Sequence, residues 1–221
     1  NWIAALSWGS PASVFYGQPL DAGQLNATSN VSGTFEYEPP PATVLPVGTH
    51  ALTLTFTPEA NSGLSPQQRT VFLTIEPAPL LCTADDKSKV YGSANPALTI
   101  SYTGLKNGET APATPPGAAC AADVASGVGT YPITLTDGSD PNYALRLQGG
   151  TLSVTRNLLT VTAEDKSRLY GDSNPAFTVS YEGFVNDDDA DDLATQPVAI
   201  CTADAASGAG AYDVVPGEGV D

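Results

Sequence analysis

The stretch ADDKSKVYGSANPALTISYTG, residues 84–104, recurs as AEDKSRLYGDSNPAFTVSYEG at residues 163–183. Farther along, CAADVASGVGTYPI begins at Cys120 and CTADAASGAGAYDV begins at Cys201. Ala84 thus corresponds to Ala163 and Cys120 to Cys201, so the later copy carries two extra residues in the intervening loop. Self-similarity at a fixed period indicates a repeat protein, in which each repeat is one structural unit.

The beginning of the chain is a more distant copy of this repeat. VFYG at residues 14–17 corresponds to VYG at 90–92 and to LYG at 169–171. VGTHALTL at residues 47–54 corresponds to VGTYPITL at 128–135. The same two motifs therefore occur at the same relative positions in the first part of the chain.

These matches predict a first repeat at residues 1–77, a second at 78–156 and a third at 157–221. The second repeat continues through residues 137–155, whereas the third stops before most of their counterparts. We therefore expect the third repeat to lack its closing strands, which leaves unpaired backbone groups at a sheet edge. Three outcomes follow: a trimmed end, pairing with a neighbouring molecule, or completion by a strand from another chain.

Short alternating runs of apolar and polar residues predict β-strands in every repeat. A period of two with one apolar face is typical of half-buried strands. Such runs lie at residues 50–56, 98–102, 131–136 and 177–181. Several short strands per repeat predict an all-β chain of three small immunoglobulin-like sandwiches, and β-grasp-like repeats with one short helix each are the alternative. The best helical candidate is a short turn within Asn186–Ala194.

The links between the repeats are very short. Only Glu76-Pro77-Ala78-Pro79 separates the first repeat's last strand from the second repeat's opening strand, and only Arg156-Asn157 separates the second repeat from the third. Two to four residues do not form a flexible tether, and proline stiffens the first link. We therefore expect the repeats to form an elongated, semi-rigid rod.

The charge balance argues against two classes of partner. The chain has 24 acidic and 8 basic residues, for a net charge of −16. No basic stripe is present to neutralise phosphates, so nucleic acid is not expected as a partner. Anionic membrane surfaces are disfavoured for the same reason. No apolar run approaches the ~20 residues that a membrane-spanning helix needs.

The repeated motif resembles a known family. YGSANPALTISYTGLKN from Tyr91, followed by SGVGTYPI from Ser126, is similar to the YGX-type MBG domain, which occurs in tandem in large bacterial surface proteins. The second repeat matches along its whole length and the third along residues 157–221. The first repeat resembles related bacterial immunoglobulin-like repeats at Ser7–Gly17, Leu25–Thr28, Gly33–Pro39 and Thr43–Pro58. The resemblance implies sandwich-like stalk or adhesive modules, outside the cell or on its surface, with no catalytic residues.

The residues likewise give no support for an enzyme. The one histidine, His50, occupies the position of Tyr131 and Tyr212 in the other repeats, which is typical of a strand residue. The chain therefore lacks a general base whose pKa is near neutral. No glycine-rich phosphate-binding motif is present either.

We expect a structural or adhesive stalk segment of a bacterial extracellular or cell-surface protein. One alternative is an adhesin module that binds a host or matrix glycan or protein, with Trp2 as a candidate stacking residue. Another is a subunit of an extracellular fibre, completed by strand donation. The expected partners are other repeats of the same long chain or neighbouring copies. No cofactor is required for such a role.

An acidic loop in the third repeat is the best candidate for a metal site. Its carboxylates are Asp187, Asp188, Asp189, Asp191 and Asp192. Closely spaced carboxylate oxygens are the ligands that calcium prefers, and a bound ion would relieve their mutual repulsion. The loop lacks the spacing of an EF-hand, so a solvated acidic loop is the other interpretation.

Three cysteines leave one without an intrachain partner if a pair forms. A Cys82–Cys120 disulfide would cross-link the second repeat, as an extracellular environment permits. It would add roughly 2–4 kcal/mol to the stability of a small domain. Cys201 would then be free or bonded to another molecule. Three buried thiols that pack as small apolar residues are the alternative.

Overall fold

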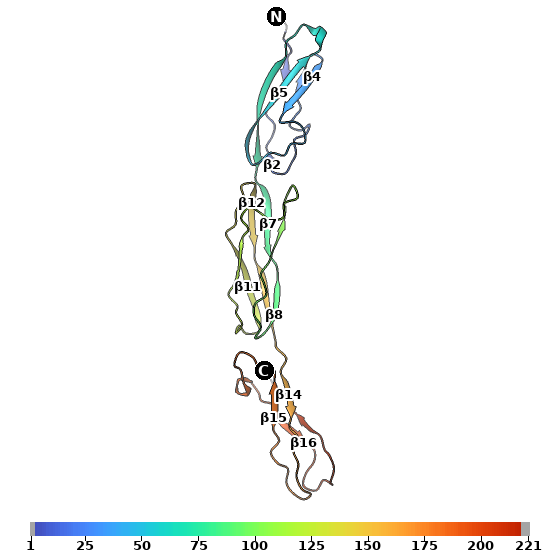
Figure 1. The fold of residues 1–221 in the computed structure, drawn as a ribbon, viewed down its shortest axis with the longest axis vertical. Helices are drawn as coiled ribbons and strands as arrows, with labels where there is room; N and C mark the ends of the chain where they lie inside the picture. The colour runs from blue at the N-terminus through green and yellow to red at the C-terminus, as the bar shows by residue number, and fades with distance from the viewer. Residues whose placement is uncertain (1–2, 218–221) are drawn as a thin grey trace. The chain divides into compact units, whose positions relative to one another are not determined.

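The computed structural model describes residues 3–217, which form an all-β structure (Figure 1). The strands are β1 (Leu6–Ser7), β2 (Val14–Phe15), β3 (Thr28–Ser29), β4 (Gly33–Glu38), β5 (Gly48–Pro58), β6 (Gln67–Glu76), β7 (Ala78–Ala84), β8 (Lys87–Val90), β9 (Ile100–Thr103), β10 (Gly117–Cys120), β11 (Gly129–Thr136), β12 (Tyr143–Gln148), β13 (Gly150–Thr155), β14 (Thr160–Ala163), β15 (Val179–Glu182), β16 (Ala199–Cys201) and β17 (Val214–Pro216). The predicted all-β fold is confirmed.

Helical structure is confined to two single 3-10 turns in the described residues. These are η1 (Ala60–Ser62) and η2 (Ala190–Asp192). The turn predicted within Asn186–Ala194 is therefore present as η2. The alternative of β-grasp-like repeats with one short helix each is wrong, because residues 78–156 contain no helical turn at all.

Parallel pairing joins the beginning of a repeat to its last strand. The sheets have the strand orders β1-β3, β2-β6-β5-β4, β12-β7-β9, β10-β11-β13-β8, β14-β15 and β16-β17. In the first repeat Phe15 on β2 lies beside Glu76 on β6, and in the second Val90 on β8 lies beside Thr155 on β13. The last strand therefore closes each of these two repeats.

The core follows from the alternation seen in the sequence. On β5 the side chains of Leu52, Leu54 and Phe56 are fully buried, and on β6 Leu73 is too. Leu52, Leu54 and Leu73 belong to one core cluster with Trp8, which is 2% exposed and donates its indole N–H to Gln24 O at 3.0 Å. Burying one such side chain contributes about 1.5–3 kcal/mol, so a few of them hold a small repeat together.

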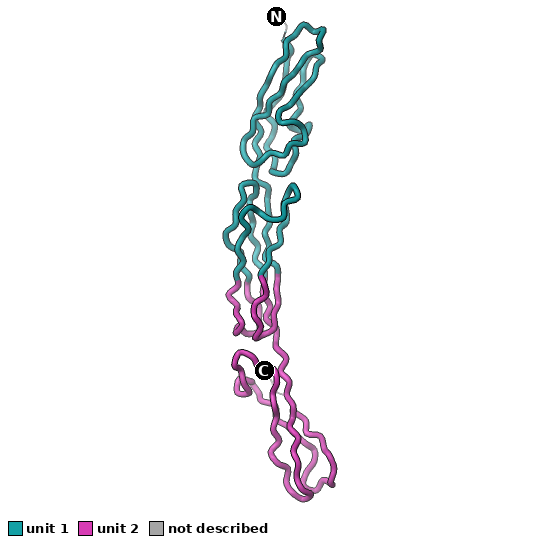
Figure 2. Tube along the Cα trace, in the orientation of Figure 1, with its two compact units in different colours: residues 1–85, 98–119, 133–150 teal, residues 86–97, 120–132, 151–221 magenta. Residues whose placement is uncertain are grey.

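The chain divides into two compact units (Figure 2). Unit 1 comprises residues 1–85, 98–119 and 133–150, and unit 2 comprises residues 86–97, 120–132 and 151–221. The division falls inside the second repeat. The link at residues 76–79 lies within unit 1, and the link at residues 156–157 lies within unit 2.

The third repeat is open where the second is closed. Residues 166–169 correspond to β8 but form no strand, because within residues 3–217 no strand corresponds to the parallel partner β13. Leu80 on β7 is fully buried, whereas its counterpart Leu159 is only half-buried. Leu169 is 78% exposed. Nothing in the described residues takes the place of the closing strand, so the inner face of this repeat stays partly uncovered.

Candidate functional site

A Tyr-Gly turn follows directly after β2 in the first repeat and after β8 in the second, the strands that pair with the last strand of their repeat. In the first repeat the backbone N–H of Tyr16 donates to Glu76 O at 2.9 Å, and in the second that of Tyr91 donates to Thr155 O at 2.8 Å. The glycines have left-handed backbones, with φ of +87° at Gly17 and +81° at Gly92. The closing strand therefore holds the backbone of each tyrosine in place.

A tight turn in the next repeat carries a carboxylate. Glu109 N–H donates to Lys106 O at 2.9 Å, and at the equivalent place in the third repeat Asp188 N–H donates to Val185 O at 3.0 Å. The two central residues of each turn have positive φ, as a type I′ turn requires. They are Asn107 and Gly108 in the second repeat and Asn186 and Asp187 in the third. Each turn thus presents an acidic side chain from the same position.

At the first junction, within unit 1, two tyrosines share one carboxylate. Tyr16 Oη donates to Glu109 Oε1 at 2.7 Å, and Tyr143 Oη donates to Glu109 Oε2. The two rings meet edge to face with centroids 5.5 Å apart. Tyr143 Oη also accepts from the backbone N–H of Lys106 at 2.7 Å, so it holds the acidic turn in place.

The shared carboxylate affects both phenols. The hydrogen bond to Glu109 is the main cause that raises the pKa of Tyr16, and burial adds to it. Burial, followed by the hydrogen bond to Glu109, raises the pKa of Tyr143 to about 12. Both phenols therefore stay protonated at neutral pH and keep donating to the carboxylate.

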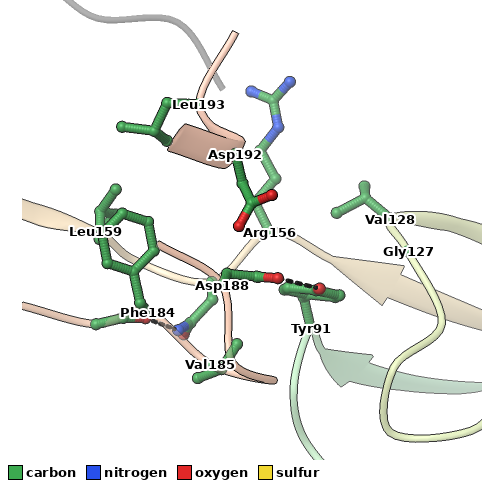
Figure 3. A pocket seen from close by; sticks show the side chains of 12 residues that line it. Tyr91, Gly127, Val128, Arg156, Leu159, Phe184, Val185, Asp188, Asp192 and Leu193 are labelled. Carbon is green, nitrogen blue, oxygen red and sulfur yellow. Dashed lines mark hydrogen bonds between the residues drawn. The ribbon is translucent and has the colours of Figure 1, made fainter. Parts of the chain in front are cut away.

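The second junction, within unit 2, repeats the arrangement. Tyr91 Oη donates to Asp188 Oδ1 at 3.3 Å (Figure 3). Asn186 Nδ2 donates to Val124 O at 3.1 Å and adds a second bond between the repeats. Beside them lies a hollow of about 270 Å³, whose apolar lining includes Val128 of the second repeat and Phe184 of the third.

The glycine beside each tyrosine allows the two repeats to approach closely. A Cβ atom on Gly17 would lie 2.5 Å from Lys106 Cγ. A Cβ atom on Gly92 would collide with Val185, the counterpart of Lys106 in the third repeat. Because real Cβ atoms do not come so close, and because the positive φ also favours glycine, both residues of the Tyr-Gly pair serve the junction.

A cation and an asparagine hold the turn from within the repeat. Lys89 Nζ donates to Ser93 O at 3.0 Å and to Asp123 O, and Asn95 Nδ2 donates to Ala122 O. In the third repeat Arg168 takes the place of Lys89 and donates to Asp172 O at 3.0 Å and to Asp204 O. This part of the repeated motif therefore has a role inside each repeat.

Comparison with known proteins gives the family of the second and third repeats. Residues 80–153 and 159–221 each match the family model of the MBG domain (YGX type). The chain belongs to this family. MBG domains are repeat modules of surface proteins and a non-enzymatic structural type. No curated protein matches the chain.

The family match confirms the resemblance seen in the sequence for two of the three repeats. The first repeat lies outside the matched residues, so its likeness to bacterial immunoglobulin-like repeats stays a prediction. It nevertheless supplies Tyr16 and Gly17 to the first MBG domain in the same way as that domain supplies Tyr91 and Gly92 to the second.

The acidic loop of the second MBG domain uses its carboxylates for local hydrogen bonds. Asp189 and Asp192 form a capping box around η2, and Asp191 accepts from Gln196 Nε2 at 3.1 Å. Asp188 accepts from Tyr91, while Asp187 is exposed with a positive φ. Among residues 3–217 no three acidic, histidine or cysteine side chains converge to hold a metal ion. Calcium binding by this loop stays a prediction.

The predicted Cys82–Cys120 disulfide is not formed in the structure, where all three cysteines are free thiols. Cys82 on β7 points into the cluster of Ala78, Leu80 and Tyr143, and burial raises the pKa of its thiol. Cys120 and Cys201 are half-buried at the ends of β10 and β16. Cys82 therefore packs as a small apolar residue.

His50 and Trp8, the other residues considered as candidates for function, have structural roles. His50 Nε2 lies 2.7 Å from Pro46 O, four residues earlier, and Tyr131 and Tyr212 donate to the carbonyl at the same offset. Trp8 is buried as expected, and Trp2 lies outside the described residues. No helix among the described residues is long and apolar enough to cross a membrane.

Sequence reasoning missed the tyrosine–carboxylate bond at the junctions. Glu109 and Asp188 stand at equivalent positions when residues 84–104 are aligned with residues 163–183, which is the signal that could have found them. The acidic loop suggested a role for five carboxylates together, and one of them, Asp188, accepts a hydrogen bond from another repeat.

The first junction can be tested by a double-mutant cycle. Removing the phenol in Tyr16→Phe and the carboxylate in Glu109→Ala should reveal a coupling of about 1.5–3 kcal/mol in the free energy of unfolding, because hydrogen bonds to charged groups have this strength. Urea denaturation of the four proteins measures it. Additive losses, within about 0.3 kcal/mol, would show that the bond does not stabilise the junction.

Tyr143 predicts a loss of stability at high pH. Its pKa is about 12 in the folded chain and about 10 when unfolded, so between these values the unfolded chain has lost a proton that the folded chain retains. The free energy of unfolding should therefore fall as pH rises from 10 to 12. The fall should be shallower in Tyr143→Phe, measured by denaturant titration at each pH. Parallel curves for the two proteins would contradict the assignment.

Proposed function

We propose that the chain is a spacer segment of a bacterial extracellular or cell-surface repeat protein, which sets the distance and orientation between neighbouring modules rather than catalysing a reaction. The observation that carries this proposal is the recurrence of one junction. A tyrosine donates to the next repeat's carboxylate and a glycine contacts the same turn, at both links between repeats.

The junction favours a stiff connection for three physical reasons. A hydrogen bond is directional, so the Tyr16–Glu109 and Tyr91–Asp188 bonds restrict rotation about the link. At Gly17 and Gly92 the side chain of the next repeat packs so close to the glycine that a Cβ atom would collide with it, which restricts sliding at that point. Each link has too few residues to act as a flexible tether. Such a role needs no cofactor, and its natural partners are further repeats of the same kind.

The adhesin alternative has weaker support than the spacer. It relied on an exposed tryptophan that could stack on a sugar, but Trp8 is 2% exposed and Trp2 lies outside the described residues. The hollow beside Tyr91 lies at the second link, where filling it would act on the junction itself. We therefore propose spacing without a dedicated ligand.

The spacer role predicts that adjacent repeats orient together in solution. Residual dipolar couplings should fit one alignment tensor for the first and second repeats, and Tyr16→Phe combined with Glu109→Ala should require two. Tyr212→Phe is the matched control, because its hydroxyl bonds Gly208 O within its own repeat. Separate tensors in the unaltered chain would mean that the repeats swing independently and would refute the spacer.

Strand acceptance is a second candidate function, favoured by the open third repeat. A groove of about 460 Å³ runs beside residues 165–168 and 207–212. Residues 87–90 in the second repeat, the counterparts of 166–169, pair with β13. A segment with the sequence pattern of β12 and β13 would therefore complete the third repeat. A fibre assembled by strand donation needs an acceptor of this kind.

A synthetic peptide with the sequence of residues 140–156 tests this second candidate. It should bind the full chain, raise the midpoint of thermal unfolding by mass action, and protect the amides of residues 158–169 from exchange. The control peptide carries Leu152→Asn and Val154→Asn, because these two side chains are buried in the second repeat. Equal behaviour of the two peptides, or no protection from either, would exclude strand acceptance.

A further inference from the structure

The third Tyr-Gly turn has the same backbone as the other two but touches no neighbouring repeat. Gly171 has φ of +87°, equal to that of Gly17. Among residues 3–217, apart from its two chain neighbours, no atom lies within 4 Å of a Cβ placed on Gly171, whereas Lys106 meets Gly17 and Val185 meets Gly92. Tyr170 is 73% exposed.

We propose that Tyr170-Gly171 is the open half of a third junction, which docks a further repeat through a type I′ turn that ends in an acidic residue. This inference rests on the proposed spacer function and extends it to a specific surface and partner. The partner's chemistry follows from the two occupied junctions. Its turn has an asparagine with positive φ, and the carboxylate two residues later accepts the tyrosine hydroxyl.

A second copy of this chain does not offer that turn. Its Glu109 and Asp188 are already bound by Tyr16 and Tyr91. Its first repeat has only Asn30-Val31-Ser32 between β3 and β4, where the second repeat has the longer segment with Glu109, and none of these three residues is acidic. The occupant is therefore a further MBG-type repeat with a free acidic turn.

Docking at Tyr170 requires the third repeat to be closed first. In the other repeats the tyrosine amide donates to the last residue of the closing strand, Glu76 or Thr155. Within residues 3–217 the amide of Tyr170 has no such partner. A closing strand would hold the backbone of Tyr170 in place, and the acidic turn of the next repeat could then accept a hydrogen bond from its hydroxyl.

The chain itself supplies the sequence for an experiment. Asp221 corresponds to Asp140 in the alignment that places Cys201 opposite Cys120, so a chain extended after Asp221 by the sequence of residues 141–221 continues in register. The extension provides β12 and β13 to the third repeat and then a new repeat with its own copy of the Val185–Asp188 turn. A shorter extension, with the sequence of residues 141–156 only, provides the strands without the turn.

Hydrogen exchange on these chains tests the docking. Both extensions should protect residues 158–169, and only the long one should slow exchange at Gly171 and at the added turn, by about tenfold. Gly171→Asn should abolish this extra protection in the long extension. The same substitution should change little in the original chain, because asparagine tolerates positive φ and nothing lies nearby. Gly208→Ala, also in open space, is the control.

Three results would overturn the proposal. The first is that the amide of Gly171 exchanges at the same rate in the short and long extensions. The second is that Gly171→Asn changes exchange equally in the original and the extended chains. The third is that either extension leaves the amides of residues 158–169 unprotected. Dipolar couplings of the first two repeats separate this failure from failure of the spacer. If those repeats share one alignment tensor while the added repeat does not join, only the third junction is wrong.

Discussion

The order between repeats depends on a directional contact that recurs at both junctions, the hydrogen bond from a tyrosine in one repeat to a carboxylate in the next. At the first junction Tyr16 Oη lies 2.7 Å from Glu109 Oε1, and at the second Tyr91 Oη lies 3.3 Å from Asp188 Oδ1. Apolar burial alone tolerates sliding, because it depends on area rather than direction. The adjoining glycine lets a side chain of the next repeat, Lys106 or Val185, pack directly against its backbone.

Closure of a repeat and docking of its neighbour are connected through the same tyrosine. Its backbone amide donates a hydrogen bond to the last strand, as Tyr91 does to Thr155, and its hydroxyl donates one to the next repeat. In the third repeat residues 166–169 form no strand and Tyr170 is exposed, although its Tyr-Gly turn keeps the positive φ of the other two.

The sequence predicted the strands well because alternation has a direct physical meaning. The run from His50 to Phe56 lies within β5, and its inward residues are the buried ones. The junction was not predictable in this way, because Tyr16 and Glu109 lie 93 residues apart and neither has an unusual neighbourhood in the sequence. Crowding of carboxylates suggested calcium, but the backbone of η2 turns Asp189 and Asp192 toward its own N–H groups. Cys82, which was expected to pair with Cys120, is a free thiol in the structure and packs with Ala78, Leu80 and Tyr143.

A neutral donor suits a junction in a chain of this charge. With 24 acidic and 8 basic residues, ion pairs between repeats would have few cations to draw on. Surface ion pairs also weaken as salt screens them, with a Debye length of about 8 Å at physiological ionic strength. A phenol keeps its proton far above neutral pH, and at Tyr16 the neighbouring carboxylate raises the pKa further. Glu109 and Asp188 therefore keep their tyrosine donors in spite of the repulsion among the acidic residues of the chain. Neither salt nor a moderate change of pH takes these donors away.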